Sequence, residues 1–134
     1  LAVLGTTDFT PGPATFTDVP TTHPNFKWIQ KLAELGITNG CTATTFCPDA
    51  PVTRGQMAAF LVRARGGITA TEAFPFRTAP AFTDVATTNT FFSHVQKLFD
   101  WGITNGCTAT TFCVDQTTTR SQMATFLSRA FLSR

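Results

Sequence analysis

The eleven residues ITNGCTATTFC occur at positions 37–47 and again, unchanged, at positions 103–113. The offset that aligns these copies also aligns residues 16–65 with residues 82–131 without a gap. Of these 50 aligned positions, 32 are identical, so we interpret the chain as an internal duplication. The repeated stretch lies in the middle of each copy and contains both cysteines of that copy, so the structure of this stretch decides how each copy folds.

Each copy is predicted to form a helix, a loop and a second helix. In the first copy, Pro24 suits the first position of a helix and Gly36 its end. Thr53 and Gln56 have the spacing of a capping box at the start of the second helix. The predicted apolar faces, in chain order, are Phe26, Ile29, Leu32 and Ala33; Met57, Phe60, Leu61 and Ala64; Phe92, Val95, Leu98 and Phe99; and Met123, Phe126, Leu127 and Ala130.

We therefore predict an all-α protein of two tandem helix-loop-helix repeats with extended, proline-containing arms. The predicted division is an extended N-terminal arm at 1–15, a first repeat at 16–65, a linker arm at 66–81 and a second repeat at 82–134. A pair of short helices cannot bury its apolar faces alone, so the repeats are expected to pack on each other or on a partner.

The four cysteines form two Cys-x5-Cys pairs, and duplication favours local disulfides Cys41–Cys47 and Cys107–Cys113. Such disulfides indicate an oxidising compartment, extracellular or periplasmic. The alternative is a metal site, but zinc sites usually have closer cysteine pairs or nearby histidines. The two histidines, His23 and His94, do not occupy matching positions in the two copies. We expect no metal and no cofactor.

Composition narrows the classes of partner. Charged residues make up 13% of the chain and the net charge is +2, without a basic run, so no nucleic-acid partner is expected. No apolar stretch approaches the roughly 18–20 residues of a membrane span. The chain also begins without a signal-peptide pattern, as a mature secreted form would. A threonine-rich, weakly charged surface suits an extracellular protein.

No catalytic residues are expected. The polar residues kept in both copies include no serine, histidine or reactive cysteine next to a plausible base. Asp18 and Asp49 are a conceivable glycosidase pair, but both lie in turns, where carboxylates commonly bind the local backbone. The sequence therefore predicts a protein that is not an enzyme.

Several spaced positions together resemble the S-layer homology repeat. They are Phe16-Thr17-Asp18-Val19, Leu35-Gly36-Ile37, Gly40, Phe46-Cys47-Pro48-Asp49 and Val52-Thr53-Arg54-Gly55-Gln56-Met57 through Ala64, with their counterparts in the second copy. The resemblance implies a non-catalytic surface module of bacteria. It also implies a bundle of three repeats that binds secondary cell-wall polysaccharide in the grooves between them.

The resemblance also nominates glycan-binding residues. Arg54 and Arg120 match the family's glycan-contacting arginine, and Asp18 and Asp84 match its aspartate after the entering phenylalanine. This chain lacks the family's acidic residue after that arginine, having Thr-Arg-Gly-Gln and Thr-Arg-Ser-Gln instead. The alternative for the arginines is a solvated first-turn side chain, or an ion pair between repeats with Asp18 or Asp84.

Two repeats leave an apolar flank uncovered where three would close a bundle, and such flanks usually bind something. The N-terminal arm carries Leu1, Val3, Leu4 and Phe9, and we hypothesise that it docks on the second repeat of another copy, as the 66–81 arm would dock on the first repeat. The leading predicted function is thus an extracellular structural protein that self-associates head to tail into a filament or surface layer. The alternative is a cell-surface anchor that binds secondary cell-wall polysaccharide.

Overall fold

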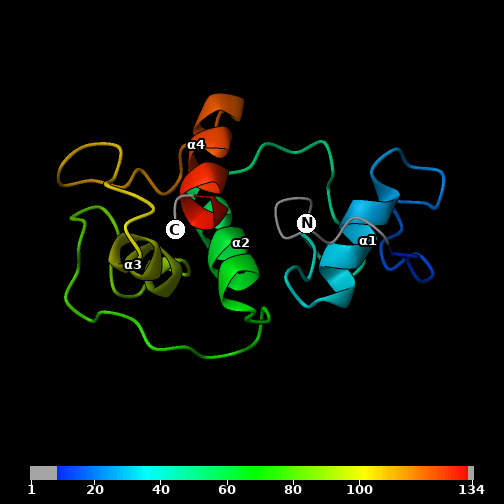
Figure 1. Cartoon of the computed structure of the whole chain (residues 1–134), viewed down its shortest axis with the longest axis horizontal. Coiled ribbons are helices and arrows are strands. Elements are labelled where there is room, and N and C mark those ends of the chain that lie inside the picture. The colour runs from blue at the N-terminus through cyan, green and yellow to red at the C-terminus, as the bar shows by residue number, and fades with distance from the viewer. Residues whose placement is uncertain (1–8, 133–134) are drawn as a thin grey trace. The chain divides into compact units, whose positions relative to one another are not determined.

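A computed structural model describes residues 9–132 of the chain. Within these residues it contains four α-helices and no strand, which confirms the all-α prediction (Figure 1). The helices are α1 (Phe26–Glu34), α2 (Arg54–Gly66), α3 (Phe92–Asp100) and α4 (Arg120–Phe131). Leu1, Val3 and Leu4 of the predicted assembly arm lie outside the described residues.

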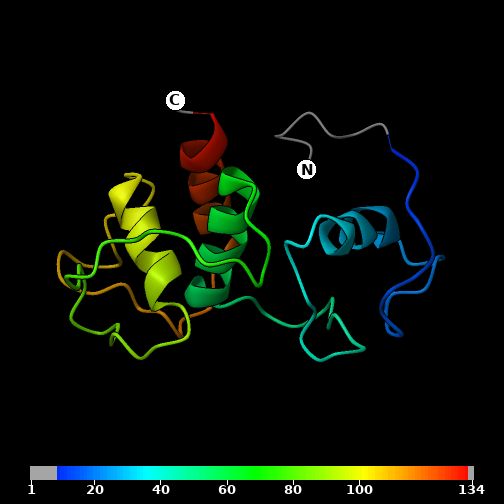
Figure 2. The ribbon, with the colours of Figure 1, turned by 90° about the horizontal axis from the view of Figure 1, so that it is seen from below.

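The helices belong to two compact units. Among the described residues, unit 1 comprises 9–50 and 68–72, and unit 2 comprises 51–67 and 73–132. Unit 1 therefore contains α1 and its cysteine loop, whereas unit 2 contains the other three helices. In unit 2, α2 packs against both α3 and α4 (Figure 2). The division into sequence repeats stays a prediction, and packing joins the second helix of the first repeat to the second repeat.

Unit 1 has a small core of its own. Phe16, Val19, Phe26 and Ile29 are buried together, and Ala33 and Phe46 pack against them. Gly36 adopts φ +72°, a left-handed conformation that ends α1 as predicted.

The start of α1 differs from the prediction. The helix begins at Phe26, two residues beyond Pro24. The reason is a turn that precedes it, in which the N–H of Phe26 donates to the carbonyl of His23 over 3.0 Å. Pro24 therefore lies inside this turn and does not occupy the first helical position.

Helix α2 is the centre of unit 2. Ala58 and Val62 are fully buried, and Phe60, which belonged to the predicted face, is only half-buried. Because α3 and α4 both lie against α2, its buried surface is wider than a single amphipathic stripe. The capping box of Thr53 and Gln56 is confirmed by reciprocal side-chain hydrogen bonds to the backbone.

A buried glutamine ties the segment before each repeat to the first helix of that repeat. The side chain of Gln30 accepts from the N–H of Thr15 over 2.9 Å, and that of Gln96 accepts from Ala81 over 3.0 Å. Gln96 also donates to the carbonyl of Ala79 over 2.7 Å. The segment that precedes each repeat is therefore held against the first helix of that repeat.

Aromatic contacts extend the same pattern. Phe9 packs edge-on against Trp28 of α1, with ring centroids 5.6 Å apart, and Phe74 packs against His94 of α3 at 5.1 Å. Positions 28 and 94 correspond in the duplication. The linker first contacts unit 1, where Ala70 donates to the carbonyl of Gly36, and then follows α3. Phe9 and most of the linker are thus engaged by the helix that follows them.

Candidate functional site

Each cysteine loop closes on its own backbone. In the second copy, the N–H of Cys107 donates to the carbonyl of Thr111 over 2.9 Å, and the hydroxyl of Thr108 accepts from the N–H of Thr111. The Cys107–Cys113 disulfide completes the ring, and the Cys41–Cys47 disulfide does the same in the first copy. Both predicted pairings are confirmed. A disulfide around so short a ring contributes about 2 kcal/mol by restricting the unfolded chain.

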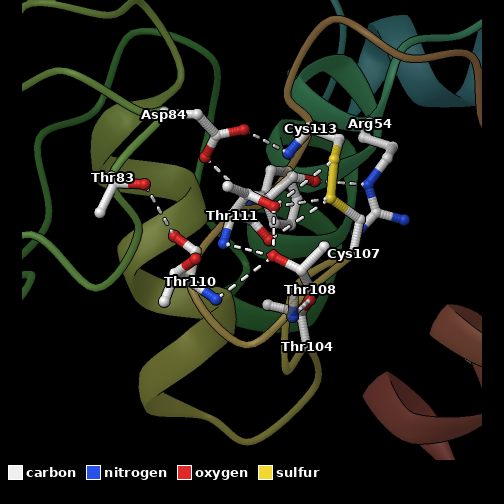
Figure 3. Close-up of a disulfide and its surroundings, with 11 residues drawn as sticks. Arg54, Thr83, Asp84, Thr104, Cys107, Thr108, Thr110, Thr111 and Cys113 are labelled. Carbon is white, nitrogen blue, oxygen red and sulfur yellow. Dashed lines mark hydrogen bonds between the residues drawn. A yellow bond between two sulfur atoms is a disulfide. The ribbon is translucent and has the colours of Figure 1, made fainter.

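An aspartate holds the end of each loop. Asp84 accepts from the N–H groups of Phe112 and Cys113 over 2.8 and 2.7 Å (Figure 3). Asp18 binds the equivalent backbone in the first copy with the same distances. Cys113 has a φ of +61°, which is unfavourable for a residue other than glycine, and the paired carboxylate bonds hold it there. Both aspartates therefore have a structural task in the loop.

The hydrogen bonds to Asp18 also affect its ionisation. The bond from the N–H of Phe46 is the largest cause of a pKa for Asp18 below its ordinary value. Because the folded pKa is lowered, this carboxylate stabilises the fold above its ordinary pKa and loses that contribution as the pH falls through the lowered pKa. The first loop is thus held by a carboxylate that stays ionised into acidic solution.

Arg54 is buried inside unit 2, although it is charged. It is only 5% exposed, and its Nε donates to the carbonyl of Phe112 over 2.7 Å. Its guanidinium lies over the rings of Phe112 and Phe126, at 4.7 and 5.2 Å from their centroids. Burial lowers the pKa of Arg54, and the charge of Asp84 opposes that effect. Arg54 therefore connects α2, the second cysteine loop and α4. Figure 3 shows Arg54 beside the Cys107–Cys113 disulfide of that loop.

An open groove of about 270 Å³ adjoins Arg54. It combines two arginines with hydroxyl and amide groups from the second loop and α4. The lining residues that matter here are Arg54, Thr104, Gln122, Thr125, Phe126 and Arg129. Arg129 also donates from Nη1 to the carbonyl of Ile103 over 3.3 Å. Cationic and hydroxyl groups beside an aromatic ring suit the binding of an acidic sugar.

The other nominated residues lie elsewhere. Arg120 is exposed at the start of α4 and lines a different hollow, of about 420 Å³, with Met123 and Leu127. Asp18 belongs to unit 1. Of the four nominated residues, the structure brings together Arg54 and Asp84.

The motif comparison missed Arg129 and Thr104. Both residues are kept in the duplication, at positions 63 and 38 of the first copy. This repetition was the available signal, but it did not show that the two residues meet. They come from different elements, with Thr104 before the second cysteine loop and Arg129 in the last turn of α4.

His94 packs against Phe74 of the linker and is close enough to Arg63 of α2 to be affected by its charge. Burial, together with the positive charge of Arg63, lowers its pKa to about 4. The imidazole is therefore neutral at pH 7. A histidine with a lowered pKa binds fewer protons in the folded state than in the unfolded chain between the two pKa values.

We expect the free energy of unfolding to fall by about 2 kcal/mol as the pH is lowered from about 6.5 to about 4. This is less than the full linkage value because solvent screens a partly exposed histidine. The sign follows because the unfolded state takes up the proton first. Urea unfolding of the wild type and of His94→Gln across this range measures the effect. The variant should lose most of the dependence, whereas His23→Gln should keep it. An unchanged slope in His94→Gln would exclude His94 as its origin.

Residues 9–132 contain no group of three or more histidine, cysteine, aspartate or glutamate side chains arranged to hold a metal ion. No helix in this part of the chain is long and apolar enough to span a bilayer.

Comparison with known proteins identifies related sequences. The family model described as the S-layer homology domain matches residues 15–58. The chain is also similar to an endoglucanase of Bacillus sp. (strain KSM-635), with 32% identity over 116 residues. The match covers 87% of this chain but 12% of the endoglucanase, so the chain spans only a small part of the length of that relative.

Proposed function

Because residues 15–58 form an S-layer homology domain, we propose that this chain acts as an anchoring module that binds secondary cell-wall polysaccharide. The domain is a non-catalytic module and implies a location at the cell surface. The two disulfides agree with the oxidising environment outside the cytoplasm. The endoglucanase activity belongs to the related protein, and the chain's own contribution is attachment.

The groove beside Arg54 is the observation that supports polysaccharide binding most directly. Among residues 9–132, the groove is lined by two cations, Arg54 and Arg129, and by no acidic residue. Guanidinium groups bind carboxylates with strong, charge-assisted hydrogen bonds, and the exposed Thr125 adds a hydroxyl suited to a sugar hydroxyl. We therefore propose an acidic saccharide as the ligand. Arg129 is the better reporter of binding because Arg54 is needed for packing.

Arg129→Gln is expected to weaken binding to isolated cell walls about tenfold or more, since a lost charge-assisted hydrogen bond is worth roughly 1.5–3 kcal/mol. Co-sedimentation with walls, and with walls stripped of polysaccharide, measures it. Arg120→Gln removes the same charge outside the groove and should bind nearly as well as the wild type. A larger loss in Arg120→Gln would move the binding site to the hollow beside Arg120. Equal binding to stripped walls would refute polysaccharide as the ligand.

A second candidate function is head-to-tail self-association into a filament or surface layer. The observation that favours it is the contrast between α2 and α4, whose apolar faces have matching sequences and different exposure. Ala58 is fully buried in α2, whereas its counterpart Ala124 is exposed in α4. The two candidates are compatible, because an anchored module can also associate with its neighbours.

A further inference from the structure

The second repeat docks on α2 through backbone and side-chain contacts. The N–H of Arg54 donates to the carbonyl of Gln116 over 2.8 Å, and that of Gly55 donates to Val114 over 2.9 Å. At the far end of α2, the guanidinium of Arg65 lies 4.6 Å from the ring centroid of Trp101. These contacts of the second repeat with α2 show what an equivalent contact on α4 would require.

Helix α4 repeats the sequence of α2 but is not covered in the same way. Met123, Ala124 and Leu127 are exposed or half-buried, whereas their counterparts in α2 are at most 4% exposed. Within residues 9–132 no partner is recorded for the backbone N–H of Arg120 or Ser121, the counterparts of Arg54 and Gly55. The 420 Å³ hollow beside these residues is mainly apolar in its side chains. Helix α4 therefore presents the docking surface of α2, and within residues 9–132 nothing occupies it as the second repeat occupies α2.

Unit 1 carries the complementary surface. Its α1 and cysteine loop are the duplicates of the α3 and loop that cover α2. Phe112 and Leu98 are at most 1% exposed, whereas their counterparts Phe46 and Leu32 are half-buried. Leu35, the counterpart of Trp101, is 43% exposed. Burial of this apolar surface on a partner would favour association.

Sterics at one position explain why α2 accepts the second repeat. A Cβ added to Gly55 would lie 2.5 Å from Cδ2 of Phe91 and 2.7 Å from Cγ2 of Val114. Only glycine therefore permits this close approach. An equivalent contact on another helix therefore needs a small residue either at the position of Gly55 or at the partner positions of Phe91 and Val114.

On α4 the same position is Ser121, whose side chain would collide with a partner that has Phe91 and Val114. The first repeat has Asn25 and Pro48 instead. Asn25 is smaller than phenylalanine and carries an amide that matches the serine hydroxyl. The change from Phe91 to Asn25 removes the closer of the two contacts, so the surface on α4 suits a copy of the first repeat better than a copy of the second.

We propose that unit 1 of one molecule docks on α4 of a second molecule, in the way that the second repeat docks on α2. The proposal rests on the self-association proposed above and identifies its interface. Each molecule has one such unit 1 and one such α4, so the contact joins different surfaces and continues from molecule to molecule. In this arrangement Ala124 is buried and Leu35 is partly covered by the second molecule, as Ala58 and Trp101 are in unit 2. Phe9 stays on α1 of its own chain.

Two variants block the two surfaces separately. Ala124→Glu places a carboxylate on the exposed face of α4, and Leu35→Glu places one on unit 1. Both positions are exposed in the single chain, so both variants should fold. Ala109→Glu, at the exposed tip of the second loop, is the matched control.

Sedimentation velocity over a range of concentrations tests the interface. We expect the wild type and Ala109→Glu to grow with concentration, and each blocked variant to stay at the 14.5 kDa mass of one chain. An equimolar mixture of Ala124→Glu and Leu35→Glu has one intact pair of surfaces and should stop at twice that mass. This dimer from two monomeric variants is the result specific to a head-to-tail contact.

The contrary outcomes are distinct. A wild type that remains monomeric at every concentration would refute self-association itself. Growth of both blocked variants would refute this interface and leave self-association standing. Loss of growth on deletion of residues 1–8, with both blocked variants still growing, would assign the contact to the N-terminal arm.

Discussion

Replacement of Gly106 by alanine is expected to lower the free energy of unfolding by about 3–5 kcal/mol, the sum of backbone strain and overpacking. Gly106 has a φ of +92°, outside the range that alanine readily adopts. A Cβ at this position would lie 2.5 Å from the carbonyl oxygens of Thr108 and Thr111. These oxygens belong to the backbone of the disulfide ring, so they cannot rotate away as a side chain can.

Gly102→Ala is the matched control. Gly102 also has a positive φ, of +72°, but no atom lies within 4 Å of an added Cβ. The control therefore measures backbone strain alone, which we expect to cost about 1–2 kcal/mol. Urea unfolding followed by circular dichroism, with the disulfides oxidised, gives both values. Equal losses in the two variants would show that the loop yields to the added methyl group and that the close contacts carry no cost.

The local structure of this protein could be predicted because its determinants lie within a few residues of one another. The disulfide pairs, the glycine ends of α1 and α3 and the capping boxes of α2 and α4 each depend on residues at most six positions apart. Duplication doubled the signal, since an accidental pattern does not recur at the same offset. The turn before α1 was missed because Pro24 is equally acceptable in a turn and at the start of a helix.

The packing partners could not be predicted in the same way. Arg54 and Arg120 follow a threonine in matching capping boxes, yet one is buried and the other exposed. Their immediate neighbours differ only in Gly55 against Ser121, which does not by itself show that one arginine is buried. The difference in burial comes from what covers each helix. The second repeat covers α2, and no described residue covers α4 in that way. Burial in a duplicated chain therefore depends on the order of the copies as well as on their sequence.

The candidate site was only partly predictable for a related reason. Family resemblance nominated Arg54, which lines the groove, and Asp84, whose charge acts on Arg54. The resemblance did not assign Asp84 to the loop backbone, where it accepts two N–H groups. Arg129 belongs to a different helix and reaches the same groove only in the folded chain. A site that combines α2, a loop and α4 cannot be derived from spacing within any one of them.

Arg54→Ala is expected to lower the free energy of unfolding by about 3 kcal/mol or more, because it removes a buried, hydrogen-bonded and well-packed side chain. The carbonyl of Phe112 would lose its partner at 2.7 Å, and the rings of Phe112 and Phe126 would lose the guanidinium between them. Arg54→Met separates these effects, since it restores most of the apolar packing without the donor. We expect Arg54→Met to be intermediate between the wild type and Arg54→Ala.

Arg120→Ala is the internal control, and its unfolding free energy should stay within about 0.5 kcal/mol of the wild type, as for most surface substitutions. Urea unfolding at a protein concentration low enough to keep the chain monomeric measures both variants. Arg54 and Arg120 have the same residue type, helix position and preceding cap. A difference of several kcal/mol between the two losses of unfolding free energy therefore measures how much Arg54 gains because the second loop and α4 cover it. Equal losses of unfolding free energy in the two variants would show that Arg54 does not connect α2 to the second loop and α4. The comparison with α2 would then no longer indicate that α4 is uncovered.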